Sequence, residues 1–143
     1  MDRKQWMGLL ARAPAATLDR LWRGLGLTPA FTWLRPPEPG SVMVQGRAGG
    51  SGAPFNLGEM TVTRCALTLE CGAVGHGYVQ GRDKRQAEQA ALADALMQTD
   101  TAGAVRKAVL EPLAAQMQAT QDSRAAKAAA TKVEFFTLVR GDG

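Results

Sequence analysis

The segment GYVQGRDKRQAEQAALADALMQ, residues 77–98, marks a change from sheet to helix, because its apolar residues change from an alternating period to a helical one. A strand is expected to end near residue 81. Asp83 is the predicted N-cap of the following helix, and Gln86, three residues later, completes a pattern like a capping box. The helix is expected to run to about Gln98, with a buried stripe made of Ala87, Ala91, Leu92, Ala95 and Leu96.

The segment at the start of the chain, residues 1–27, is predicted to be a helical hairpin. It holds two amphipathic helical patterns separated by Pro14, and its cations outnumber its carboxylates. A basic amphipathic hairpin can lie on a membrane or bind a partner protein. It can equally pack on the sheet of its own chain, and the sequence leaves these alternatives open.

Residues 30–81 alternate with a period of two and predict an antiparallel sheet of about four strands. The first two strands are expected over residues 31–35 and 41–48, separated by a turn that contains Pro36, Pro37, Pro39 and Gly40. The longest strand is expected over residues 59–70, and Cys71-Gly72 is expected to turn the chain into the last one.

Residues 83–130 are expected to be helical, with two alanine-rich helices separated at Pro112 after the helix that Asp83 begins. Residues 132–140 carry apolar side chains on both alternating faces and predict a terminal strand covered on both sides. The whole chain, residues 1–143, is therefore expected to form one α+β domain.

Composition excludes several classes of protein. The chain has 143 residues, 17 Lys plus Arg, 13 Asp plus Glu, and a net charge of +4. It contains no run of eighteen apolar residues, so no membrane span is expected. Cys65 and Cys71 are expected to be free thiols in a reducing cytoplasm. One histidine and two cysteines provide no metal-ligand set, and no nucleophile motif points to a catalytic residue.

Two turns of the chain are candidate anion-binding sites. The first combines Arg47 with a glycine-rich loop, whose backbone N–H groups can converge on an anion; its glycines are Gly49, Gly50 and Gly52. The second is the helix start with Arg82 and Lys84, where the helix dipole also favours a phosphate. A flexible turn and a plain capped helix with solvated charges are the alternative interpretations.

A third group of residues is a candidate for binding partner proteins. It comprises aromatic and apolar residues near both ends of the chain: Trp6, Trp22, Phe135, Phe136 and Leu138. The terminal FFTLVRG segment can complete the chain's own sheet or add a strand to a partner's sheet. Arg140 follows directly and can reach a phosphate.

Four segments together resemble the PhnG family, the G subunit of the carbon–phosphorus lyase core complex. They are KQWMGLLARA (4–13), RAGGSGAPFNLGEMTVTRCALTL (47–69), GYVQGRDKRQAEQAALADALMQ (77–98) and VEFFTLVRGD (133–142). The resemblance implies a subunit of alpha-D-ribose 1-methylphosphonate 5-triphosphate synthase, in which methylphosphonate replaces the adenine of ATP. It also implies H, I and J partner subunits, with two copies of each in the core complex.

Within such a complex, the resemblance assigns the nucleosidase-like chemistry chiefly to the I subunit, and the iron–sulfur cluster and SAM to the J subunit. The chain is then expected to be an accessory subunit that binds no cofactor and has no activity alone. Its cationic side chains would supply positive electrostatic potential to bound ATP or phosphonate. A purely architectural subunit is the first alternative, and a small basic nucleic-acid-binding protein, suggested by a pI near 9.5, is the second.

Overall fold

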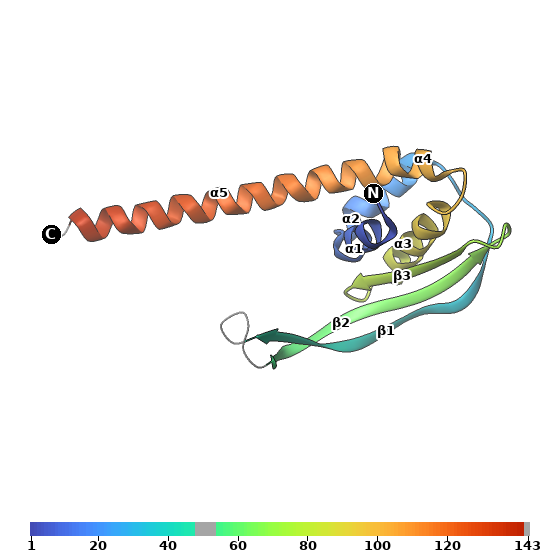
Figure 1. Cartoon of the computed structure of the whole chain (residues 1–143), viewed down its shortest axis with the longest axis horizontal. Helices are drawn as coiled ribbons and strands as arrows, with labels where there is room; N and C mark the ends of the chain where they lie inside the picture. Colours follow the sequence, from blue (N-terminus) through green and yellow to red (C-terminus); the bar gives the residue numbers. More distant parts are fainter. Residues whose placement is uncertain (48–53, 142–143) are drawn as a thin grey trace. The chain divides into compact units, whose positions relative to one another are not determined.

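The computed structural model describes residues 1–47 and 54–141 of the chain (Figure 1). The chain divides into two compact units, Met1–Leu113 and Ala114–Gly143. The first unit contains an antiparallel sheet and the helices that pack on it, and the second contains most of one long helix. The α+β class predicted from the sequence is confirmed.

The sheet has three described strands in the order β1-β2-β3, each antiparallel to its neighbour: β1 (Phe31–Arg47), β2 (Pro54–Leu69) and β3 (Val74–Gln80). The predicted turn at Cys71-Gly72 joins β2 to β3. Gly72 has a φ of 92°, a conformation that a residue without a Cβ adopts freely. Arg35, Ala66 and His76 are paired across the three strands.

The prediction of two separate strands before residue 48 was wrong, because residues 31–47 form one continuous strand. Its prolines are tolerated because β1 lies at the edge of the described sheet, where a missing N–H costs no ladder hydrogen bond. The pairing register shifts between Trp33 and Arg35 and again between Arg35 and Glu38. These irregularities absorb the proline-rich segment without a turn.

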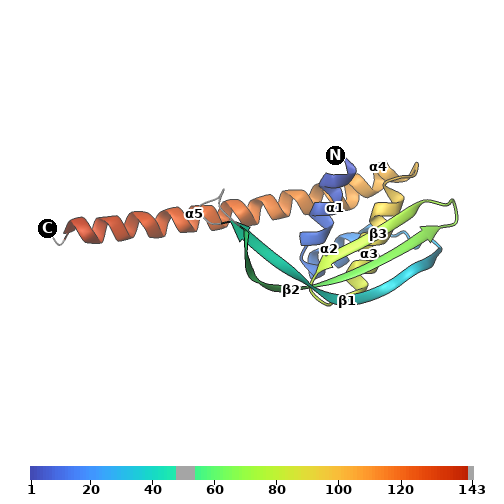
Figure 2. The same ribbon diagram turned by 60° about the horizontal axis from the view of Figure 1, so that its bottom comes forward.

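Three helices cover one face of the sheet, as Figures 1 and 2 show: α1 (Arg3–Arg12), α2 (Ala15–Leu25) and α3 (Lys84–Leu96). Helix α1 packs against β3 and α3, and α2 packs against α3. The buried apolar residues of the two N-terminal helices include Leu9, Leu10 and Leu18. The N-terminal hairpin therefore packs on its own sheet, which is one of the alternatives left open by the sequence.

The predicted stripe of α3 is confirmed, since all five of its residues are buried: Ala87, Ala91, Leu92, Ala95 and Leu96. Beyond it, α4 (Ala102–Val105), the π-helical turn η2 (Arg106–Leu110) and α5 (Glu111–Gly141) follow without interruption. Pro112 does not separate two helices, because it is the second residue of α5, where a proline is tolerated, and a wide π turn precedes it.

The predicted terminal strand over residues 132–140 was also wrong, because α5 continues to Gly141. Residues 114–130 are rich in alanine, the best helix former, and a helix satisfies its backbone hydrogen bonds without a neighbouring strand. Once such a helix is nucleated, each further residue adds one hydrogen bond. The helix therefore continues through residues 132–140, although their apolar side chains alternate as in a strand.

Candidate functional site

Helix α3 lies directly on strand β3, and two glycines make this approach possible. A Cβ atom on Gly75 would overlap the carbonyl oxygen of Ala91, and one on Gly77 would overlap the carbonyl oxygen of Ala87. Small residues on both elements therefore bring the two backbones together. This contact fixes the helix start at residues 82–84 relative to the sheet.

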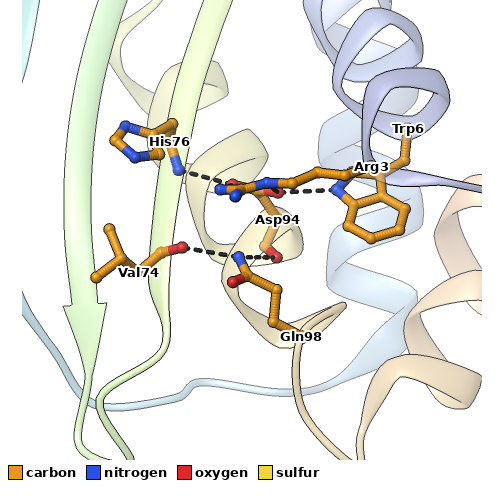
Figure 3. A network of polar contacts seen from close by, with 6 residues as sticks. All are labelled: Arg3, Trp6, Val74, His76, Asp94 and Gln98. Carbon is orange, nitrogen blue, oxygen red and sulfur yellow. Dashed lines mark hydrogen bonds and ion pairs between the residues drawn. The ribbon is translucent and has the colours of Figure 1, made fainter.

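A buried carboxylate, Asp94, ties α1, α3 and β3 together (Figure 3). It accepts hydrogen bonds from Arg3 Nε and Nη2 at 3.2 and 2.9 Å and from Trp6 Nε1 at 2.8 Å. The backbone N–H of His76 donates to its second oxygen at 2.9 Å. Asp94 is completely buried, so its charge is compensated by these donors rather than by water.

Sequence reasoning did not single out Asp94 for this role. The available signal was a lone carboxylate inside the otherwise apolar run ALADAL, where a charge requires a partner. Gln98 extends the same connection, because its Nε2 donates to the Val74 carbonyl oxygen at 2.7 Å. The network therefore holds the backbone of β3 against α3 on both sides of Gly75.

The predicted cap of α3 is confirmed, since the backbone N–H of Gln86 donates to Asp83 Oδ1 at 3.0 Å. The side chain of Gln86 does not complete a capping box. Its Nε2 instead donates to the Ala13 carbonyl oxygen, which ties α3 to the end of α1. Arg82 and Lys84 flank the cap, and both are exposed. The carboxylate of Asp83 thus lies at the helix start that the sequence assigned to a phosphate.

Beside this helix start is a cavity of about 360 Å³, which Asp19, Asp83 and Arg85 line together with neighbouring residues. Asp19 forms ion pairs with Arg23 at 3.0 Å and with Arg85 at 3.5 Å. The hydrogen bond from Gln89, together with these two arginines, lowers the pKa of Asp19. Two carboxylates therefore face the cavity, and its charge is mixed rather than positive.

The structure does not bring the two predicted anion sites together. Arg47 is the last residue of β1 and is paired with Pro54, whereas the junction after β3 lies beside Thr61, whose carbonyl oxygen accepts from Gly81. Thr61 lies seven positions after Pro54 along β2, which is roughly 23 Å at the rise of a strand. Gly49, Gly50 and Gly52 lie outside the described residues.

The predicted partner-binding residues fall into two groups. Trp6 and Trp22 are buried in the core of the first unit, so little of either side chain is exposed for contact with a partner. Phe135, Phe136, Leu138 and Arg140 belong to the helix α5 instead of a strand. They cannot extend a partner's sheet in this conformation.

The remaining sequence predictions for the site concern thiols and membranes. Cys65 and Cys71 are both free, as predicted; Cys65 is buried and Cys71 exposed. Burial raises the pKa of the Cys65 thiol to about 11. Among the described helices, none is long and apolar enough to cross a membrane. Within residues 1–47 and 54–141, no cluster of three His, Cys, Asp or Glu side chains could hold a metal ion.

Comparison with known proteins decides the family. The model of the family described as "Phosphonate metabolism protein PhnG" matches residues 1–141. The chain belongs to the PhnG family. A PhnG protein of Rhizobium meliloti (strain 1021) is 45% identical to it over 141 residues, which cover 99% of this chain and 90% of the relative. That relative is named "Alpha-D-ribose 1-methylphosphonate 5-triphosphate synthase subunit PhnG". Membership of PhnG favours the expected subunit role over nucleic-acid binding.

Proposed function

We propose that this chain is the G subunit of an alpha-D-ribose 1-methylphosphonate 5-triphosphate synthase and acts in phosphonate catabolism as part of that complex. The observation that carries the proposal is the 45% identity to a synthase subunit over 99% of the chain. Identity at this level over nearly the full length supports the same fold, the same partners and the same place in the assembly.

In this proposal the chain is an accessory subunit of a transferase. Four of its described carboxylates have structural roles: Asp2 and Asp83 cap helices, Asp94 joins three elements, and Asp19 pairs with arginines. The reacting groups then belong to partner subunits of the H, I and J type, present in two copies each. ATP and methylphosphonate are substrates of the whole complex, and a reducing cytoplasm suits the two free thiols.

The accessory role has a chemical rationale. Displacement at the anomeric carbon of a ribose passes through an oxocarbenium-like transition state, which water can also capture. A subunit that holds the phosphonate close to that carbon and excludes water favours transfer over hydrolysis. Arg82 and Lys84 are exposed and can supply positive field to the triphosphate or the phosphonate, and Arg47, the glycine loop and Arg140 are further candidates.

A purely architectural role is the second candidate function, and the charge at the junction favours it. Asp83 lies between Arg82 and Lys84 and already occupies the helix start, while Asp19 faces the adjoining cavity. Local carboxylates weaken an anion site. In this version the exposed junction contacts a partner subunit and no residue of it touches a substrate.

A double substitution separates these roles. Arg82→Ala/Lys84→Ala is compared in the reconstituted complex with Arg106→Ala/Lys107→Ala, which removes the same two charges from the exposed face of η2. A substrate role predicts normal assembly with slower transfer to phosphonate and more hydrolysed ribose triphosphate. An architectural role predicts loss of assembly. Normal assembly with normal transfer would exclude both roles for this pair.

A further inference from the structure

The face of the sheet opposite α1, α2 and α3 carries a group of cationic and hydrogen-bonding side chains that no sequence motif predicts. The residues of this open face are Leu34, Arg35, Arg64, His76 and Tyr78, and all five are exposed. They come from three strands, because Arg64 is paired with Tyr78 and Ala66 is paired with both Arg35 and His76. The register therefore places them around the small side chain of Ala66.

These side chains surround a shallow cavity of about 310 Å³. Its lining comprises the five open-face residues together with Cys65, Ala66 and Gly77. A second cavity of about 250 Å³ adjoins it, and Arg35 and Arg64 line both. The pairing register of β1 and β2 shifts between Trp33 and Arg35, beside the first cavity, and such irregularities change the direction in which side chains point. A volume of this size lies near the lower limit, roughly 300 Å³, of small-molecule sites.

Two arginines make the open face positive, and Glu38 is the one carboxylate among the described residues that line the adjoining cavity. Within the part of the chain that the structure describes, neither Arg35 nor Arg64 forms an ion pair or a side-chain hydrogen bond. Glu38 is paired with Arg64 in the strand register and lines the second cavity, yet its carboxylate is not within ion-pair distance of either arginine. The Cys65 thiol is neutral at pH 7, because burial raises its pKa to about 11.

The backbone beneath these side chains is fixed. The N–H of His76 donates to buried Asp94, while the imidazole of the same residue is directed to the other face of the sheet (Figure 3). Gly75 and Gly77, on either side of His76, are in direct contact with α3. The backbone of the strand that carries His76 and Tyr78 is thus held in place against α3, so binding requires no rearrangement of this strand.

We propose that Arg35, Arg64, His76 and Tyr78 form a binding site for a phosphate-type oxyanion on the open face of the sheet. A guanidinium offers a planar fork of donors that matches phosphoryl or phosphonyl oxygens, and an imidazole and a phenol add further donors. The nature of the anion rests on the proposed function, in which both a triphosphate and a phosphonate are substrates. The site stands apart from the Arg82–Lys84 junction, which lies beyond the end of β3.

The test uses the full-length chain and the assembled complex, with sodium tripolyphosphate and methylphosphonate as separate titrants in calorimetry. Loss of a charge-assisted hydrogen bond typically weakens binding about tenfold or more, so Arg35→Ala/Arg64→Ala is expected to weaken binding at least tenfold. Arg106→Ala/Lys107→Ala is the matched control, and its affinity is expected to equal that of the unsubstituted chain. Glu38→Gln removes a negative charge that repels the anion and is expected to strengthen binding about two- to fivefold.

The two titrants identify the source of the anion. Tighter binding of tripolyphosphate indicates the nucleotide's phosphate chain, and tighter binding of methylphosphonate indicates the acceptor; both support the site. If neither binds to the chain or to the complex, or if the double substitution weakens binding no more than the control, the site is refuted. That result would not refute the proposed function, because the synthase activity of the complex is measured independently, by product formation.

Discussion

Substitution of Asp94 is the sharpest test of how the chain holds its sheet against its helices. Asp94→Ala leaves two buried donors, Trp6 Nε1 and the backbone N–H of His76, without an acceptor. Each such group costs about 1–3 kcal/mol. The Arg3 side chain is 48% exposed, so its guanidinium can return to water and adds little. We expect a loss of about 2–5 kcal/mol in the free energy of unfolding, a large part of the 5–15 kcal/mol typical of domains.

The assay is urea denaturation of the full-length chain, followed by circular dichroism. With a slope of about 1–3 kcal/mol per molar urea, the Asp94→Ala midpoint is expected to fall by roughly 1–3 M. Asp94→Asn keeps the volume and one acceptor oxygen and is expected to lose less. Lys4→Ala, an exposed change on α1 next to Arg3, is expected to stay within about 0.5 kcal/mol of the unsubstituted chain. An Asp94→Ala midpoint equal to that of Lys4→Ala would show that the hydrogen bonds to Asp94 do not stabilise the fold.

Three further predictions concern stability. Gly77→Ala would place a Cβ in steric overlap with the carbonyl oxygen of Ala87 and 2.7 Å from Cys65 Sγ, so we expect the free energy of unfolding, measured in urea, to fall by more than about 3 kcal/mol. Gly103→Ala is the control, because open space surrounds Gly103, and it should not destabilise the chain. Asp83→Ala removes the α3 cap and should cost about 1 kcal/mol, checked by the thermal midpoint; no shift would contradict it. Burial raises the pKa of the Cys65 thiol from 9.0 to about 11, so its contribution to the free energy of unfolding is complete below pH 9 and is lost as the pH rises toward 11. Cys65→Ala should therefore reduce the fall in stability between pH 9 and pH 11, measured by urea denaturation at each pH. An unchanged pH dependence would contradict this prediction.

The parts of the fold that depend on local pattern could be predicted from the sequence. The N-cap at Asp83, the stripe of α3 and the turn at Gly72 each have a signal within a few residues. Two other local patterns predict the wrong element. The prolines after Arg35 read as a turn because the sequence does not show that β1 is an edge strand. The alternating residues near Phe135 predict a strand, but the alanine-rich helix before them continues through them.

The residues that depend on tertiary register could not be predicted. Arg35, Arg64 and His76 lie far apart in sequence, and only the strand pairing gathers them around Ala66. Asp94 shows the same limit, since its four hydrogen bonds come from residues 18 to 91 positions away. The family, by contrast, could be predicted, because the quoted segments lie in a chain whose residues 1–141 match the family model.

The role of this chain in the synthase is tested by product analysis of the complex with and without it. The partner subunits are co-expressed with or without it and supplied with ATP and methylphosphonate, and the ribose products are identified by phosphorus NMR. Phosphonate-linked ribose triphosphate is expected only when the chain is present, and free ribose triphosphate or no reaction is expected when it is absent. Formation of the phosphonate-linked product at the same rate without the chain would contradict this role.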